Sequence, residues 1–315
     1  MPNIVRRPSK TAAVTQTSPK SITTEDLGTA VGLGILTALS WLLPHRWHGA
    51  FARLVGKPAR LALNSGPQTV ARIAALRGCH REEAEQLLVA LATEDLRATM
   101  ELLRCYRPPG PFPVVDLSGL EHVEAGLGAG RGVILWVGHF VHNPLTSKVA
   151  MSRAGYGVHH LSHPRHGFSI TRFGMNYLNK IRTVAENRYL AERVTLALDT
   201  AKPALARLHN CLEGNHIISM GARATGSRPL RVPFMNGAIT LAPGAPVMAL
   251  KTGAALLPAI PMREPSGLKM TIGPPLVADS VQKLADAYMT YTAPYVTRLP
   301  AQWLGWLHLD AASGE

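Results

Sequence analysis

The chain has 315 residues, which is long enough for one large α/β domain with an N-terminal extension or for two ordinary domains. Its 33 Lys and Arg against 20 Asp and Glu give a formal charge of +13, which favours anionic partners such as phospholipid surfaces, phosphorylated glycolipids or acidic carrier proteins. Aromatic content is only 6% and no nucleic-acid module is recognisable, so no nucleic-acid partner is expected. Three widely spaced cysteines without a CxxC pair predict neither a disulfide framework nor a zinc site.

The first 45 residues divide into a tail and a candidate membrane segment. Residues 1–25 are rich in Ser, Thr, Pro and Lys and are predicted to be a disordered tail. Asp26 and His45 flank a segment of 18 residues, 27–44, that carries no charge. That length is at the short end of the roughly 17 to 25 apolar residues that span a bilayer. We therefore predict a membrane anchor helix over residues 26–45, spanning or dipping, with a buried core helix as the alternative.

A helical pattern follows the anchor segment. Apolar residues at 84, 87, 88 and 91 recur with the i, i+3, i+4, i+7 spacing of one helix face. This predicts a helical subdomain over residues 46–107. A proline-rich linker comes next, and residues 114–310 are predicted to form the α/β domain.

The chain is organised around a strand that delivers a histidine. Val133–Val137 are apolar without alternation, which is typical of a strand buried on both faces of a mainly parallel sheet. Gly138 ends the run, and His139 follows in the strand-to-helix turn, where open α/β sheets place their chemistry. Asn143 as N-cap and Pro144 as first helical residue predict that a helix begins here.

Strands and helices alternate from residue 132 to residue 276. Further strands are predicted at residues 158–161, 181–184, 216–220, 255–262 and 269–272. Helices are predicted at residues 168–178, from Pro203 to Gly214, and near 280–298. The predicted fold class is therefore α/β, with a mainly parallel central sheet flanked by helices and an N-terminal helical membrane-anchoring region.

The segment around His139 resembles the first motif of the lysophospholipid acyltransferase superfamily, in the branch of the lipid A biosynthesis (lauroyl/myristoyl) acyltransferases. There a strand ends in His-x4-Asp or His-x4-Glu, and the histidine is the general base. His139 matches that histidine, whereas the acid would fall at position 144, which is Pro144 here. Further blocks resemble the family at residues 221–226, 232–234, 243–258 and 300–308. The last of these is similar to the family's closing Pro-x-Gln-Trp-x-Trp-x-His.

The resemblance implies a membrane-associated acyltransferase on the cytoplasmic face of the bacterial inner membrane. It would move a fatty acyl chain from an acyl carrier protein or coenzyme A thioester to a hydroxyl or amine of a lipid or glycolipid, without a cofactor. No Gly-x-Ser-x-Gly elbow supports a serine hydrolase. Two alternatives remain open. One is a catalytically degenerate homologue that binds acyl chains or a partner enzyme, and the other is a membrane-surface interaction protein that uses its basic face.

Further candidate site residues surround the motif. Asn143 is four residues after His139, and an amide can orient an imidazole; a helix N-cap is its alternative role. Replacing Pro144 with Glu is expected to restore the family's acid one helical turn from His139. Five arginines in segments that follow strands are candidates for phosphate recognition: Arg165, Arg172, Arg223, Arg228 and Arg231.

Six of the 13 histidines lie between residues 139 and 166. A metal site is one interpretation of such a cluster. No His-Glu-x-x-His motif or nearby carboxylate accompanies these histidines, and alternate strand and loop positions would point their rings in several directions. No metal site is therefore predicted.

Overall fold

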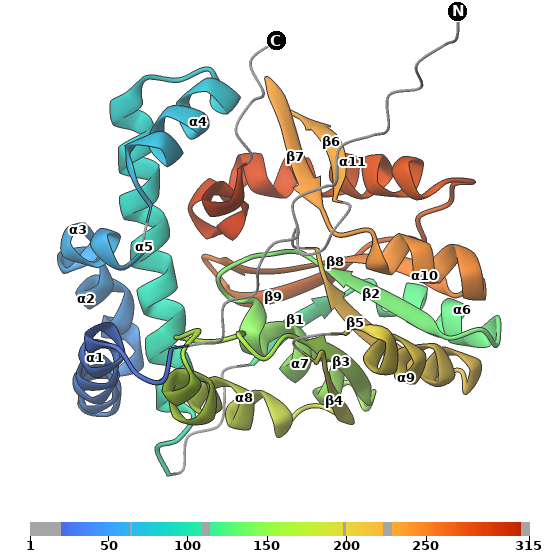
Figure 1. Cartoon of the computed structure of the whole chain (residues 1–315), viewed down its shortest axis with the longest axis horizontal. Helices are drawn as coiled ribbons and strands as arrows, with labels where there is room; N and C mark the ends of the chain where they lie inside the picture. Colours follow the sequence, from blue (N-terminus) through green and yellow to red (C-terminus); the bar gives the residue numbers. More distant parts are fainter. Residues whose placement is uncertain (1–19, 64, 109–113, 198–199, 223–228, 310–315) are drawn as a thin grey trace, which may run out of the picture.

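The computed structural model describes residues 20–63, 65–108, 114–197, 200–222 and 229–309. Helices form the N-terminal part, and the longest of them, α5 (Arg81–Arg104), runs beside the sheet (Figure 1). Four other helices precede the first strand: α1 (Thr24–Leu42), α2 (His48–Leu54), α3 (Gly56–Ala59) and α4 (Pro67–Arg77). All four contact α5. The predicted apolar face of α5, residues 84, 87, 88 and 91, is buried, so the periodicity was interpreted correctly.

The start of the described chain is more ordered than its composition predicts. A capping box between Thr23 and Asp26 begins α1. The backbone carbonyls of Lys20 and Ser21 accept hydrogen bonds from the N–H groups of Arg172 and Phe173. The predicted disorder of residues 1–25 is therefore wrong for residues 20–25, because these backbone bonds and the cap fix them. Residues 1–19 lie outside the described part of the chain.

Helix α1 occupies most of the segment predicted as the membrane anchor. It packs along α5, and its end is held by Trp41, whose indole N–H donates to the Leu103 carbonyl at 3.1 Å. Arg104 donates to the carbonyls of Ser40 and Leu43 at the same end. Among the described helices, none is long and apolar enough to cross a membrane. The helix is thus confirmed, and the membrane-spanning interpretation has no support.

A seven-stranded sheet forms the centre of the fold, in the order β1-β9-β8-β2-β5-β3-β4. All neighbours are parallel except β8 and β9. The strands are β1 (Val115–Ser118), β2 (Val133–Val137), β3 (Val158–Ser162), β4 (Glu192–Thr195), β5 (Ile217–Gly221), β8 (Ala255–Glu264) and β9 (Gly267–Ile272). The mainly parallel sheet with β2 at its centre confirms the α/β part of the predicted fold class.

Helices cover both faces of the sheet, which explains the unbroken apolar run of β2. Alternate β2 side chains enter two different cores: Ile134 and Trp136 on one face, Val133, Leu135 and Val137 on the other. The first face is covered by α9 (Lys202–Glu213), α10 (Gly244–Thr252) and α11 (Val281–Arg298). The second is covered by α6 (Leu120–Gly128) and α7 (Asn143–Arg153). Both cores contain β2, so this strand is buried on both sides as predicted.

One stretch of the sheet's flank was predicted incorrectly. Residues 181–184 belong to helix α8 (Asn179–Asn187), and the expected strand is β4, further along the chain. Of residues 168–178, only 172–178 are helical, and Gly174–Leu178 within them form a π-helical turn. Residues 168–170 form a loop because the buried side-chain oxygen of Asn179 accepts hydrogen bonds from the N–H groups of Phe168 and Ser169.

A separate hairpin, β6 (Leu230–Phe234) and β7 (Gly237–Leu241), packs against α11 and extends past it, away from the sheet (Figure 1). After α11, two 3₁₀ turns, Pro300–Gln302 and Leu304–His308, close the described chain. The Phe234 ring packs against Trp303 and Trp306 with centroids 5.3 and 6.3 Å apart. The hairpin and the C-terminal turns thus form one unit above the carboxyl end of the central strands.

Candidate active site

The turn after β2 presents His139 at the carboxyl end of the sheet. The Gly138 N–H donates to Ala259 of β8 and ends the strand pairing. The Phe140 N–H then bonds back to the Gly138 carbonyl at 2.9 Å, which turns the chain sharply. Phe140 is fully buried, so the His139 side chain between them is directed away from the core.

The C-terminal 3₁₀ turns hold this loop in place. The Leu304 N–H donates to the His139 carbonyl, and the Val141 N–H donates to the Gln302 carbonyl, both at 2.8 Å. The Gln302 side chain also accepts the Arg263 N–H at 2.8 Å and donates to the Arg263 carbonyl at 2.7 Å. The buried Gln302 amide therefore fastens the segment that carries the closing motif to strand β8, beside the His139 loop.

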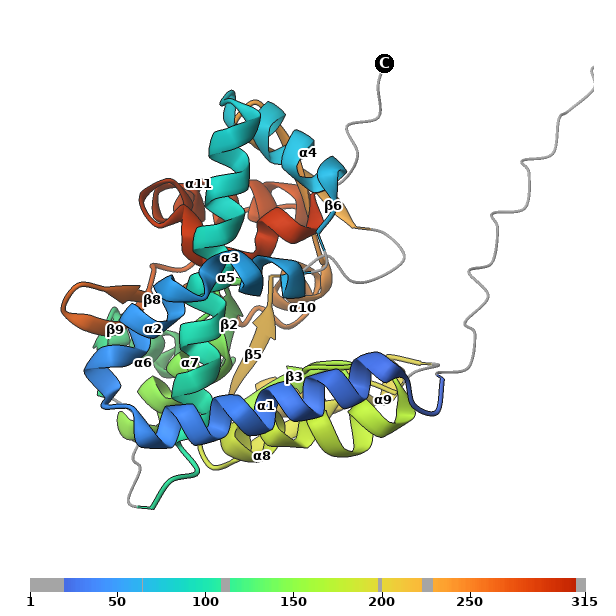
Figure 2. The same ribbon diagram turned by 90° about the vertical axis from the view of Figure 1, so that its left-hand side faces the viewer.

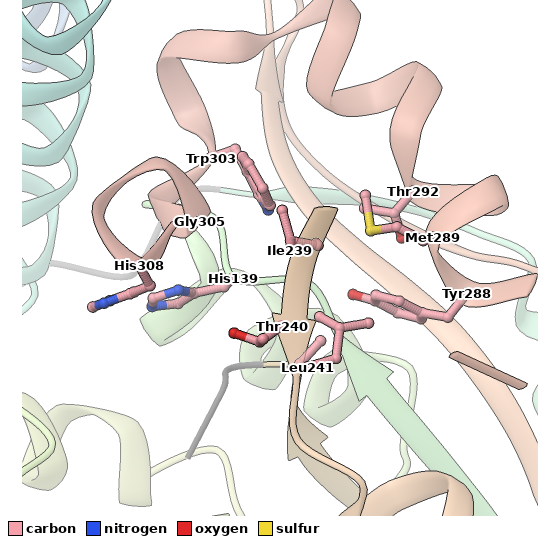
Figure 3. Close-up of a pocket in the computed structure, with 11 residues that line it drawn as sticks. His139, Ile239, Thr240, Leu241, Tyr288, Met289, Thr292, Trp303, Gly305 and His308 are labelled. Carbon is pink, nitrogen blue, oxygen red and sulfur yellow. The ribbon is translucent and has the colours of Figure 1, made fainter. Parts of the chain in front are cut away.

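A second histidine from this segment stacks on the first. The rings of His139 and His308 lie 5.4 Å apart between centroids, with an angle of 18° between their planes. Figure 3 shows the two rings side by side at one end of a cavity. Stacking restricts the plane of the His139 ring, which is what a general base requires for its nitrogen to meet a fixed proton donor.

The cavity that contains His139 comprises about 410 Å³ of empty space, part of which is open to solvent. Its walls come from β7, α11 and the C-terminal turns (Figure 3). Most of the lining is apolar: Ile239, Leu241, Tyr288, Met289 and Trp303. The hydroxyl of Thr240 adds a polar group on the side of the histidines. The mainly apolar walls suit a hydrocarbon chain.

The two halves of the predicted motif line different cavities. Pro144 lines a second cavity, of about 340 Å³, together with His142, Glu101 and Arg182. Helix α7 begins one residue earlier than predicted, so Asn143 is helical, and its side-chain oxygen accepts a bond from Ser147 at 2.9 Å. Asn143 is therefore not the N-cap that the sequence predicts. An acid at position 144 would enter the second cavity instead of the one with His139.

The second cavity holds a buried histidine-carboxylate network that the sequence did not reveal. His142 Nε2 lies 3.2 Å from Glu94 Oε2, and Glu101 pairs with Arg263. Burial raises the pKa of Glu101, but hydrogen bonds and charges from His45, Arg263 and His142 outweigh it and bring the pKa to about 2. Glu101 thus stays ionised, and its ion pair with Arg263 ties α5 to strand β8 behind the His139 loop, which is called the active-site loop below.

The predicted phosphate-binding arginines are spread over the molecule. Arg172 lies beside the start of α1, through its backbone bond to Lys20. Arg165 follows β3, and its N–H donates to the His163 ring. Arg231 lies on β6. None of these three is among the described residues that line the His139 cavity. Arg223 and Arg228 lie outside the described residues, and the assignment of all five stays a prediction.

The clustered histidines point to separate partners, as their alternating positions predict. Three of them form polar contacts with different residues: His159 with Glu192 at 2.9 Å, His160 with Ser219 at 2.8 Å, and His166 with Glu186 at 3.2 Å. They therefore do not converge on one site with His139.

Sequence reasoning found His139 but missed the residues that complete its cavity. His308 was visible as the last residue of the closing motif, and only the folded structure brings it to His139. Tyr288 and Thr240 carry no motif, because they reach the cavity through the packing of α11 and β7. The apolar cavity at a strand end, with a histidine at one end, is the arrangement expected for transfer of an acyl chain.

Comparison with known proteins agrees with this arrangement. The sequence profile of the bacterial lipid A biosynthesis acyltransferases matches residues 15–309. No curated protein matches the chain with significance. The match covers nearly the whole chain, from before α1 to the end of the closing motif. The chain therefore belongs to the bacterial lipid A biosynthesis acyltransferase family.

Proposed function

We propose that the chain is an acyltransferase that moves a fatty acyl group from an acyl carrier protein or coenzyme A thioester to a hydroxyl or amine of a lipid or glycolipid, with His139 as general base. The observation that carries the proposal is the position of His139 in an apolar cavity at the carboxyl end of β2. Family membership supports acyl transfer in general.

In the proposed reaction, His139 takes the proton of the acceptor hydroxyl as that oxygen attacks the thioester carbonyl. The new C–O bond forms, the C–S bond breaks, and the imidazolium returns its proton to the thiolate that leaves. No covalent intermediate with the protein is required. The apolar side chains of Ile239, Leu241 and Met289 would contact the acyl chain and exclude water, which otherwise competes as an acceptor.

The missing motif acid favours a second candidate, a catalytically degenerate homologue that binds acyl chains or a partner enzyme. Pro144 cannot supply a carboxylate, and the recorded contact of the Asn143 amide is with Ser147. Stacking by His308 supports the catalytic candidate, because it restricts the His139 ring without an acid. Mass spectrometry of lipids from cells with and without the chain separates the two. A missing acylated lipid supports the enzyme, and an unchanged lipid profile supports the degenerate homologue.

We further propose that α1 associates with the cytoplasmic face of the bacterial inner membrane, lying on its surface. Three apolar residues spaced four apart, Leu27, Val31 and Ile35, are 54%, 63% and 57% exposed, and Leu42 on the same side is 80% exposed. At 100° per residue they span one 80° arc. The buried residues of the helix, such as Leu33, lie on the opposite side. Such a stripe on a peripheral helix (Figure 2) suits a membrane interface.

The membrane proposal is tested by sedimentation with vesicles that contain anionic phospholipid. The double variant Val31→Glu, Ile35→Glu is expected to lose most vesicle binding, because two charges would enter the acyl region. Val277→Glu is the matched control, since Val277 is 89% exposed and lies between β9 and α11. Equal binding by the double variant and the control would refute the role of α1.

A further inference from the structure

Four side chains that commonly bind metals lie together on the α9 face of the sheet. The ligand atoms of His159, Glu192 and Cys211 are all within 4.8 Å of one another. His159 Nδ1 is 2.9 Å from the Glu192 carboxylate, and the His216 ring lies 5.2 Å from the His159 ring between centroids. The cluster therefore combines two imidazoles, a carboxylate and a thiol.

The fold brings these residues together from four elements. The register of β3 and β4 sets His159 opposite Glu192, so their side chains share a face. His216 comes immediately before β5, the other neighbour of β3. Cys211 comes from the last turn of α9, and its carbonyl accepts the His216 N–H at 2.9 Å. Because the ligands come from separate elements, no short sequence motif predicts this site.

We propose that His159, Glu192, Cys211 and His216 bind one zinc ion. A sulfur, two imidazoles and a carboxylate form a ligand set that zinc accepts in tetrahedral geometry. Neighbouring ligand atoms around zinc are roughly 3.5 Å apart, given bonds of about 2.0 to 2.3 Å. The ligand atoms of His159, Glu192 and Cys211 need to contract by at most about 1.3 Å, which side-chain rotation supplies. Cys211 binds as thiolate and releases its proton to solvent.

In the described structure the Arg207 guanidinium is the cation that pairs with Glu192, in the place that the metal ion would take. The guanidinium bonds to both Glu192 oxygens, at 3.1, 3.1 and 2.7 Å. The Arg207 side chain is half exposed, so it can turn into solvent when a metal replaces it. Cys211 is only 1% exposed, so its thiol is shielded from solvent.

The site lies at the end of the sheet opposite to His139. Strands β2 and β5 are parallel and in register, so His216, which precedes β5, is one strand length from His139, which follows β2. Five residues of strand correspond to roughly 16 Å. The ion would clamp the edge strand β4 and helix α9 to the sheet. Its role is therefore structural, and the inference is independent of the proposed acyl transfer.

The test uses the purified full-length chain in detergent with a phosphine reductant, after removal of metals by a chelator. Co²⁺ is the spectroscopic probe, because a thiolate ligand to Co²⁺ gives a near-ultraviolet charge-transfer band. We expect this band to reach saturation at one Co²⁺ per chain and to disappear when Zn²⁺ is added. We also expect Zn²⁺ to raise the melting temperature of the chain.

Four variants test the site: two remove a proposed ligand, one is a control and one removes the competing arginine. Cys211→Ser is expected to lose the charge-transfer band, whereas Cys79→Ser, at another free cysteine, is expected to keep it. His216→Gln changes an exposed side chain, so it should fold, and it is expected to weaken Co²⁺ binding at least about tenfold. Arg207→Gln is expected to tighten binding about thirtyfold, the effect of removing one unit charge about 4 Å from a divalent ion in water-like surroundings.

Two results would overturn the proposal. One is a wild-type chain without a charge-transfer band at saturating Co²⁺, and the other is a Cys211→Ser chain that keeps the band. A third result applies if Cys211→Ser does not fold. In that case, unchanged Co²⁺ affinity in both His216→Gln and Arg207→Gln would overturn the proposal. Acyl-transfer activity enters none of these measurements.

Discussion

Gln302→Ala tests the contact that fastens the C-terminal turns beside the active-site loop. The Gln302 amide bonds to both the N–H and the carbonyl of Arg263, and its side chain is buried, 6% exposed. Truncation leaves two buried backbone groups without these partners. Each such group costs about 1 to 3 kcal/mol, so we expect the free energy of unfolding to fall by about 2 to 6 kcal/mol. The acyl-transfer rate should fall as well, because the same segment bonds to the His139 carbonyl.

Urea denaturation followed by tryptophan fluorescence measures the change. Gln282→Ala is the matched control, since Gln282 also donates to a backbone carbonyl, that of Arg231, but at the exposed surface. It should change the free energy of unfolding by less than about 0.5 kcal/mol. If Gln302→Ala costs less than about 1 kcal/mol, or no more than its control, the segment is not held as described.

Two further predictions concern the cavity behind the active-site loop. The pKa of Glu101 is lowered from 4.5 to about 2. Its ionised form therefore stabilises the fold above pH 4.5, and this stability is lost as the pH falls from 4.5 through 2. The shift corresponds to about 3 kcal/mol. Glu101→Gln should flatten this part of the pH dependence of unfolding, and an unchanged slope would contradict the assignment. Pro144→Glu should not raise the acyl-transfer rate, contrary to what the motif alone predicts, because residue 144 lines the cavity with Glu101. A rate increase would show that the new acid reaches His139.

The strands of the core were predictable because each carries a strong local signal. Val133–Val137 lie between two glycines without a polar residue, and the predicted bounds agree with β2. The prediction of a strand at residues 181–184 was wrong because β-branched side chains favour a strand, whereas tertiary contacts hold these residues in helix α8. The Asn179 side chain holds the preceding loop, and Ala185 packs into a core with α5 and α7 as part of a helix.

The site was predictable only where its residues belong to one segment. His139 is marked by the end of a buried strand, and the family motif adds its role. His308 comes from the other end of the chain, and no periodicity links the two rings. The motif also misled about Pro144, since a spacing of five residues does not say which side of a turn each side chain faces. Pairing between distant segments decides these features, and one sequence does not reveal it.

The central claim is that His139 is the general base of an acyl transfer. The most direct measurement is the rate at which purified wild type and His139→Ala transfer a labelled acyl group from an acyl carrier protein thioester to bacterial lipid extract. Proton transfer by a positioned base contributes roughly 100- to 10,000-fold, so we predict a loss of that size with unchanged circular dichroism. His209→Ala, on α9, is the control and should retain the wild-type rate. A His139→Ala protein that keeps the full rate would contradict the account.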